Sequence, residues 1–224
     1  MKQKFKKWLY PIVGLGLLSI LIVSCKKEDS PIPSTVTDID GNSYHTTIIG
    51  TQVWLVENLK VTKYNDGTDI PLWANNFSPG YCWYNSDQSN FNTYGALYNW
   101  YAVNTKKICP KGWHVPSEEE WQTLTLYLGG AKTAAYKLKE SGTEHWNSPN
   151  DGATNETGFT ALPGGYNASS GFILIGSNGL WWSSTEYNIF PSNAIVRGMD
   201  FYGGLVRYSH APYSWLLSVR CIKD

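Results

Sequence analysis

The feature that most constrains the fold of this chain is its many aromatic residues, which are separated by frequent glycines. The sequence contains 11 Trp, 15 Tyr and 21 Gly among 224 residues. From Glu140 onward the apolar pieces are short and are separated by Gly, Asn and Ser, which indicates strands and long loops, not helices. Because aromatic side chains bury large areas, packed rings can hold together a loop-rich domain.

Size and charge narrow the class of protein further. The roughly 190 residues after the N-terminal region are enough for one domain with a real core and too few for two. Lys and Arg together number 18, as do Asp and Glu, and charged residues are only 16% of the chain. A chain without a basic excess offers no electrostatic footprint for nucleic acid, so we expect no nucleic-acid partner.

Residues 1–24 are predicted to be a lipoprotein signal peptide. Lysines precede an apolar run from Trp8 to Val23, which at about fifteen apolar residues is shorter than the ~20 needed for a permanent membrane span. The run ends in "LIVSC", which resembles the bacterial lipobox. We therefore predict that Cys25 is lipidated and anchors the chain to a membrane through acyl chains, each buried methylene adding roughly 0.8 kcal/mol. The alternative is that Cys25 only ends a membrane anchor.

Residues 25–35 are predicted to be a lipidated tether. The stretch "KKEDS" after Cys25 resembles the signal that sends lipoproteins of Bacteroidetes-type bacteria to the outer face of the outer membrane. "SPIPSTVT" is typical of a stiff Pro/Ser linker. Together they predict a lipid-anchored outer-membrane protein exposed at the cell surface, with an ordinary hydrophilic tether as the alternative.

A β-hairpin is predicted at the start of the folded domain. Residues 36–39 form one arm, Asp40-Gly41 is the turn, and "SYHTTIIG" is the returning arm. An EF-hand calcium loop that started at Asp38 would require Gly and Glu where Ser43 and Ile49 stand. The turn is therefore the better interpretation of "DIDGN".

Two helices are predicted on spacing and end signals. Leu97, Trp100 and Tyr101 stand at helical spacing, which predicts a helix over residues 92–103. A second helix follows Ser117, because Ser117 and Glu120 form a capping box, and it ends before the glycine pair at 129–130.

The stretch "CPKGWHVPSEEEWQTL" at residues 109–124 also raises the possibility of an active site. Glu118 and Glu119 complement the positive end of the helix dipole, and Glu120 belongs to the capping box. We therefore interpret all three carboxylates as helix-start residues in a solvated first turn, with no clear partner. His114 precedes the helix in an extended segment and is interpreted as a hydrogen-bonded framework residue in preference to a catalytic base.

The cysteines and histidines carry no recognisable catalytic or metal-binding motif. The three cysteines after Cys25 are Cys82, Cys109 and Cys221, which allow one disulfide and one odd thiol in an oxidising compartment. The histidines are scattered, with no HExxH, CxxC or GxSxG pattern. We expect no metal, no cofactor and no catalytic residue.

Several long motifs resemble the Fibrobacter succinogenes major paralogous domain. They cover residues 36–224, which we take as one domain, and they occur in the order expected for that family. The motifs are "DIDGNSYHTTIIGTQVWLVENLK", "YCWYN", "YGALYNWYAV", "CPKGWHVPSEEEWQTL", "HWNSPNDGATNETGFTALPGGY", "LWWSSTE" and "SVRCIKD".

This resemblance implies an α+β domain related to the C-type-lectin-like and formylglycine-generating-enzyme folds. Such a domain has a small twisted antiparallel sheet, two main helices and long Gly- and aromatic-rich loops, and its last strand returns beside the first. The resemblance also implies a disulfide between Cys109 and Cys221, with two buried thiols as the alternative. The enzyme relatives bind copper through two closely spaced cysteines, which this sequence lacks, so their oxidase activity is not expected.

The leading functional hypothesis is a non-catalytic recognition domain that binds glycan or protein ligands through its late loops. Tyrosines among small polar residues make good contact surfaces, although each ring could equally belong to the core. Trp181 and Trp182 are expected to include at least one core residue, because consecutive strand residues face opposite sides. The predicted ligand-binding residues are Tyr166, Tyr187, Tyr202, Tyr208, His210 and Tyr213.

Two other functions stay open, as does the oligomeric state. One is an enzyme that acts on polysaccharide, which would need two opposed carboxylates. The other is a structural component of the envelope without a specific ligand. The segment "WNSPND" lacks the motifs of calcium lectins, although Asn147, Asn150 and Asp151 could line a loop site. The dispersed carboxylate candidates for the enzyme are Glu140, Glu144, Asp151, Glu156, Glu186 and Asp200.

Overall fold

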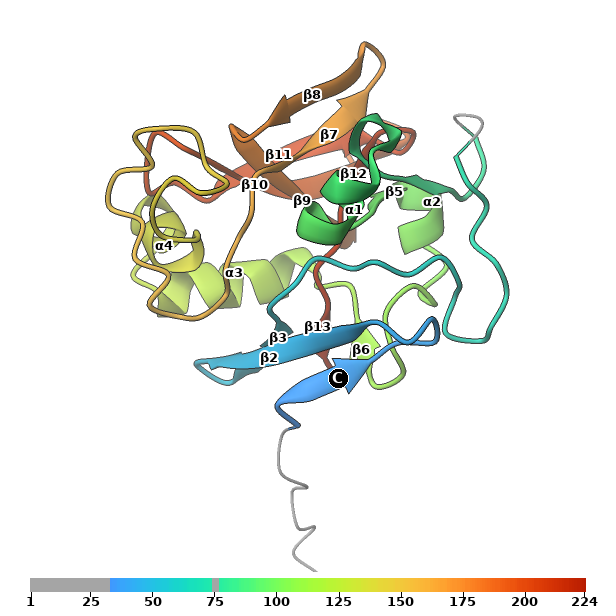
Figure 1. The fold of residues 1–224 in the computed structure, drawn as a ribbon, viewed down its shortest axis with the longest axis horizontal. Helices are drawn as coiled ribbons and strands as arrows, with labels where there is room; N and C mark the ends of the chain where they lie inside the picture. The colour runs from blue at the N-terminus through green and yellow to red at the C-terminus, as the bar shows by residue number, and fades with distance from the viewer. Residues whose placement is uncertain (1–32, 74–76) are drawn as a thin grey trace, which may run out of the picture. The chain divides into compact units, whose positions relative to one another are not determined.

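Two β-sheets divide the strands of the described part of the chain, and helices lie beside them (Figure 1). The computed structural model describes residues 33–73 and 77–224. The predicted signal peptide, Cys25 and all but the last residues of the predicted tether lie outside the described residues. Within the described residues no helix has both the length and the apolar character needed to cross a membrane.

The smaller sheet has the strand order β1–β2–β3–β13–β6. Its strands are β1 (Thr35–Thr37), β2 (Ser43–Ile49), β3 (Gln52–Leu55), β6 (Trp113–His114) and β13 (Ile222–Lys223). All its pairings are antiparallel. The final strand β13 lies between β3 and β6, so the expectation that the last strand returns beside the first is wrong.

The larger sheet has the order β11–β10–β9–β7–β12–β5–β4, with β8 paired to β7. Its strands are β4 (Tyr81–Cys82), β5 (Leu97–Asn99), β7 (Gly164–Ala168), β8 (Gly171–Ile175), β9 (Asn178–Glu186), β10 (Asn193–Asp200), β11 (Arg207–Pro212) and β12 (Leu216–Ser218). The strand β11 is an edge strand. Two sheets with helices confirm the mixed α+β class. The expectation of one small antiparallel sheet is wrong, because the described residues form two sheets and β9 pairs in parallel with β7 and β12 in the larger one.

The helices of the described residues are short. They are the 3-10 turn η1 (Tyr84–Ser86), α1 (Gln88–Tyr94), α2 (Trp100–Val103), α3 (Glu118–Tyr127) and α4 (Ala131–Leu138). The predicted capping box is confirmed at the start of α3. The helix α4 was not predicted, because it begins directly after the glycine pair that ends α3.

The single helix predicted over residues 92–103 is wrong. The helix α1 ends at Tyr94, and Gly95 follows with a φ of 81°. A Cβ atom at Gly95 would lie 2.9 Å from the carbonyl oxygen of Leu59, so this position requires glycine and cannot continue a helix. The strand β5 then pairs with β12, and α2 starts only after Asn99, whose side chain caps it.

The N-terminal hairpin is confirmed, and its loop satisfies the Asp38 carboxylate internally. Val36 pairs with Tyr44. Asp38 accepts hydrogen bonds from the backbone amides of Asp40 and Asn42, both at 2.9 Å, and from the hydroxyl of Tyr44 at 2.6 Å. This carboxylate therefore stabilises the turn.

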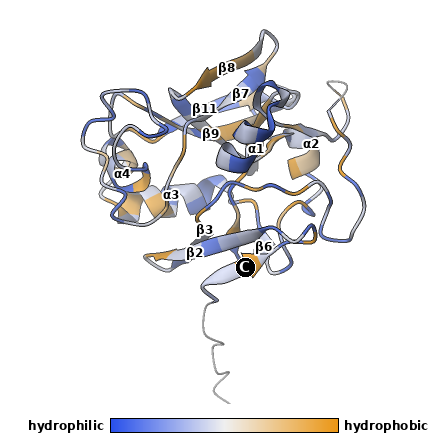
Figure 2. Ribbon diagram, viewed as in Figure 1, coloured by the Kyte–Doolittle hydropathy of each residue, from blue (hydrophilic) through white to orange (hydrophobic). Residues whose placement is uncertain are grey.

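Two strands have buried side chains on both faces and so separate two core clusters. Trp54 on β3 packs against Trp121 of α3, with ring centroids 5.0 Å apart, while its neighbour Leu55 faces the other cluster. On β9, Trp181 and Trp182 are both fully buried and belong to different clusters. The expectation that this pair supplies core residues is confirmed. Figure 2 shows hydrophobic stretches on α2, α3 and α4 and mainly polar residues on α1.

The disulfide between Cys109 and Cys221 is confirmed, with Cα atoms 6.1 Å apart. It joins the segment before β6 to the residue that precedes β13. The third cysteine, Cys82, is a buried free thiol. Burial raises the pKa of this thiol to about 12, so it stays protonated and unreactive at neutral pH.

Candidate ligand-binding surface

Three of the six predicted ligand-binding residues lie together near the edge of the larger sheet. They are Tyr187, directly after β9, and Tyr208 and His210 on the edge strand β11. With Phe190 from the β9–β10 loop they form what we call the aromatic patch. None of the six predicted residues is fully buried.

The centre of the aromatic patch is a stacked pair of rings. The Tyr187 and His210 rings are nearly parallel, with centroids 4.3 Å apart and an interplanar angle of 4°. Phe190 lies 5.1 Å from His210, and Tyr208 meets Tyr187 edge-on at 6.5 Å. Stacked and edge-to-face rings add to the energy of area burial, so these side chains hold one another in place.

Backbone contacts of the β9–β10 loop position the stacked pair. The amide of Tyr187 donates to the carbonyl of Asn193 at 2.8 Å, and the Asn193 side chain lies 3.1 Å from Nδ1 of His210. The amide of Tyr213 donates to the carbonyl of Ser192 at 2.8 Å. The loop is therefore folded back over β11, which brings Tyr187 against a strand that follows it by about twenty residues.

A buried ion pair lies under the aromatic patch. Arg197 on β10 is buried, and its Nε donates to Glu118 at 2.9 Å, with a second contact from Nη2. The guanidinium of Arg197 lies 5.2 Å from the ring centroid of Tyr208, a cation–π arrangement. Burial raises the pKa of Tyr208, and the nearby Glu118 carboxylate adds to this effect. The phenol therefore stays neutral and keeps its hydrogen-bonding proton.

The aromatic patch and its neighbour Ile189 expose large apolar side chains. Ile189 is 70% exposed, and Phe190 and Tyr208 are each 51% exposed. Exposed aromatic groups beside an arginine are typical of residues that dominate binding energy at interfaces. The arrangement offers contact surface to a ligand, with rings that are already ordered.

The other three predicted residues lie elsewhere. Tyr166 stacks on Trp215 at 5.4 Å, and Tyr213 stacks on Trp100 at 4.2 Å, so both rings are partly covered by tryptophan. Tyr202 is 74% exposed in the turn between β10 and β11. The structure therefore brings together half of the predicted set.

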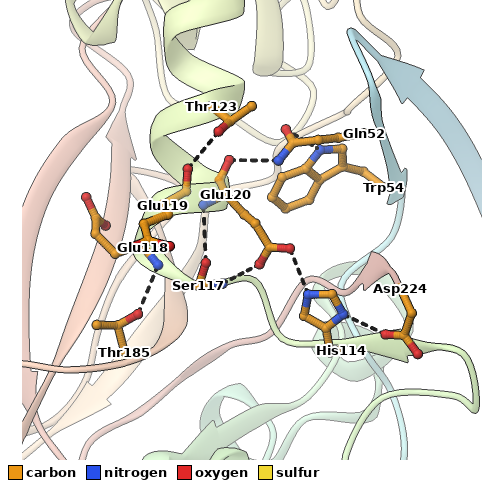
Figure 3. Close-up of polar contacts among 10 residues, drawn as sticks. All are labelled: Gln52, Trp54, His114, Ser117, Glu118, Glu119, Glu120, Thr123, Thr185 and Asp224. Carbon is orange, nitrogen blue, oxygen red and sulfur yellow. Dashed lines mark hydrogen bonds and ion pairs between the residues drawn. The ribbon is translucent and has the colours of Figure 1, made fainter.

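His114 and the three glutamates form a framework at the start of α3 (Figure 3). His114 bridges two carboxylates, with Nδ1 at 2.6 Å from Asp224 and Nε2 at 2.9 Å from Glu120. Burial opposes the charged ring, but the hydrogen bonds to Asp224 and Glu120 outweigh it and raise the pKa of His114. The framework interpretation of His114 fits these contacts. The expectation that the glutamates lack partners is wrong for Glu118 and Glu120.

Three of the six dispersed carboxylates contact a basic side chain. Asp200 pairs with Arg207, and Glu156 lies 3.1 Å from Lys137. Glu140 contacts Nδ1 of His145 through both carboxylate oxygens at 2.9 Å. Together with Glu144 these two residues are the one group in the described chain whose ligand atoms, all within 4.8 Å, could hold a metal ion. Sequence reasoning missed this group, because a Glu-x-x-x-Glu-His spacing is no recognised metal motif.

Comparison with protein families gives one match. The model of the Fibrobacter succinogenes major domain matches residues 48–223, which is most of the chain. No curated protein and no solved structure matches this chain.

Proposed function

Because the chain belongs to the Fibrobacter succinogenes major domain family, we propose that it is a cell-surface lipoprotein whose domain binds glycan or protein ligands without catalysis. In this proposal Cys25 is lipidated, the anchor holds the protein in the outer membrane, and the domain is exposed outward. The domain is taken to be a relative of lectin-like folds. The lipobox-like sequence and the Pro/Ser-rich tether support the anchor.

One observation carries the proposal of binding. The Tyr187–His210 stack orders two rings at an exposed edge, beside Tyr208 and Phe190. Rings that are ordered before a ligand arrives lose little conformational entropy on binding. A packed core explains buried rings, but it does not explain why half-exposed rings gather at one edge. Contact with a ligand supplies the missing apolar cover.

The test is binding of the folded domain to glycan and protein arrays. A chain that starts at Pro33 should fold, because both core clusters and the disulfide lie within the compact unit 33–224. We expect Tyr208→Ala and Phe190→Ala each to weaken binding by about tenfold or more, as truncated interface hot spots do. The matched control is Tyr202→Ala, which removes an exposed tyrosine outside the aromatic patch. Equal losses for Tyr202→Ala and Tyr208→Ala would contradict the assignment of the patch.

The two alternatives give other results in the same assay. An enzyme that acts on polysaccharide releases product, and its turnover depends on single carboxylates such as Glu140 or Glu186. A structural envelope component shows no saturable binding to any glycan or protein. The anchor and the surface exposure are tested separately. Cys25→Ala should abolish incorporation of labelled fatty acid. Protease treatment of intact cells should digest the wild-type domain.

A further inference from the structure

A small cavity separate from the aromatic patch has the composition of a sugar-binding site. Its volume is about 150 Å³, and none of its wall residues belongs to the patch. The wall combines residues from the end of β7, the segment before β12 and the segment before β4. The lining residues are Trp73, Asn167, Ala168, Ser169, Ser214 and Trp215.

Asn167 is the residue of this wall that most requires an occupant. It is only 5% exposed, and its side-chain amide forms no hydrogen bond with any described residue, but its polar atoms are not among the fully buried atoms without a partner. The amide therefore faces the cavity that it lines. An amide has two donors and two acceptor lone pairs, which a hydrogen-bonding occupant of the cavity can satisfy.

Other polar groups also line the wall. The indole Nε1 of Trp73 is buried and has no hydrogen-bond partner. The exposed Ser169 and the partly exposed Ser214 add two hydroxyl groups to the wall. The cavity wall therefore offers donors and acceptors around a space that accommodates more than one water molecule.

The rest of the wall is aromatic, and no lining residue carries a charge. Trp215 is held by its stack on Tyr166, at 5.4 Å and 19°. Indoles pack well against apolar C–H surfaces, while the amide and hydroxyls suit hydroxyl groups. A charged ligand would find no counter-charge. The volume is below the roughly 300–1,000 Å³ of pockets for drug-sized ligands, so the cavity admits one ring and no more.

We propose that this cavity binds one neutral sugar ring, at the end or at a branch of a glycan. This proposal rests on the proposed function, because both treat the domain as a recognition module. It assigns the sugar to the cavity, with Asn167 as the hydrogen-bonding centre and Trp73 and Trp215 as the apolar walls.

The test is an NMR titration of the chain that starts at Pro33, with glucose, galactose, mannose and N-acetylglucosamine as separate probes. We expect at least one of them to shift the side-chain amide signals of Asn167 and the indole N–H signal of Trp73 in a saturable manner. Asn167→Leu should weaken this binding at least tenfold, and Ser214→Ala should weaken it several-fold. The control Tyr202→Ala, at an exposed tyrosine outside both the cavity and the aromatic patch, should leave the sugar affinity unchanged.

Stability separates a binding role of Asn167 from a structural role. Because leucine has a similar size and the Asn167 amide has no partner within the described residues, Asn167→Leu should keep the thermal midpoint while binding is lost. A lower midpoint with unchanged sugar binding would overturn the proposal, as would the absence of saturable shifts with all four sugars in the wild-type protein.

The arrays then separate this inference from the proposed function. If an array ligand is lost with Tyr208→Ala and retained with Asn167→Leu, and no sugar shifts the Asn167 signals, the proposed function stands and the cavity proposal fails. If no array ligand and no sugar binds, both fail. If a sugar binds and Asn167→Leu abolishes its binding, the cavity proposal is supported whatever the patch variants do.

Discussion

Arg197 on β10 and Glu118 at the start of α3 form a buried ion pair between residues 79 positions apart in the sequence. The backbone amide of Glu118 also donates to the hydroxyl of Thr185 on β9, at 3.0 Å. The first turn of α3 is thus attached to the strands that carry the aromatic patch. A buried ion needs its partner, so loss of either residue should destabilise the domain. It should also disturb the position of Arg197 beside the Tyr208 ring.

Removing one partner of this pair should destabilise the domain strongly. We expect Glu118→Ala to lower the free energy of unfolding by about 3–5 kcal/mol, because Arg197 is left buried without a counter-charge. Its neighbour Glu119 lies on the same first turn but is exposed, so Glu119→Ala should stay within about 0.5 kcal/mol. Urea denaturation measures both. Similar small effects for the two variants would show that the pair is not buried as described.

Loss of the disulfide should be nearly as costly. The bridge between Cys109 and Cys221 closes a loop with a sequence separation of 112, for which the chain-entropy model gives about 4–5 kcal/mol. We expect the Cys109→Ala, Cys221→Ala double variant to lose up to this amount. Dithiothreitol should lower the denaturation midpoint of the wild type and leave that of the double variant unchanged. An equal response of both proteins would mean that the bridge does not form.

His114 should make stability depend on pH. Its pKa is raised in the folded state by Asp224 and Glu120 against the effect of burial, so the protonated ring stabilises the fold. This contribution is fully present below the unfolded value of about 6.5 and is lost as the pH rises through the higher folded pKa. The ring is partly exposed, so we expect no more than about 1 kcal/mol.

The measurement for His114 is a comparison of wild type and His114→Gln at several pH values. The wild type should be more stable at pH 6, where Asp224 and Glu120 are ionised, and this advantage should shrink toward pH 9. Asp224→Asn should remove much of the same pH dependence, because it removes the carboxylate 2.6 Å from Nδ1. A stability difference that grows with pH would contradict the assignment.

Arg220 should tolerate no replacement, although it forms no ion pair with any of the residues that the structure describes. It is fully buried, and it donates to the side chain of Asn58 at 2.8 Å and to the carbonyls of Phe159 at 2.5 Å and Leu55 at 3.3 Å. Burial lowers the pKa of Arg220 to about 9. We expect Arg220→Met to cost more than about 3 kcal/mol, because several buried acceptors lose their donor at about 1–3 kcal/mol each.

Lysine should not rescue this position. A compact ammonium cannot replace the planar fork that reaches three acceptors at once, so Arg220→Lys should also be strongly destabilised. The control is Arg207→Lys, at an arginine whose side chain is 54% exposed, where we expect a change of at most about 1 kcal/mol. Chemical denaturation of the three variants checks this prediction. Comparable stability of Arg220→Lys and wild type would show that charge alone is required.

Part of the fold could be predicted because its determinants are close together in the chain. The Ser117–Glu120 capping box spans three residues, and the turn that Asp38 stabilises spans four. The helix over residues 92–103 failed for the opposite reason. Helical spacing of Leu97 and Trp100 is visible in the sequence, but the approach of Gly95 to the backbone of Leu59 and the pairing of β5 with β12 are not.

The candidate site was predictable only in its residue types. Composition directed attention to late tyrosines, yet it could not distinguish Tyr208 in the patch from Tyr213, which stacks on Trp100. Nothing in the sequence separates Glu118 from Glu119, although one is buried against Arg197 and the other is exposed. The unpaired amide of Asn167 had no sequence signal either.

The sequence by itself determined the hairpin turn, the helix cap, the net charge of zero and the large number of aromatic side chains. Only the tertiary structure decided which rings meet, which glutamate is buried and which amide faces a cavity. The physical reason is that turns and caps depend on hydrogen bonds between residues three or four apart. Burial and stacking depend on contacts between segments as distant as Asn58 and Trp181, which lie 123 residues apart and meet at 2.8 Å.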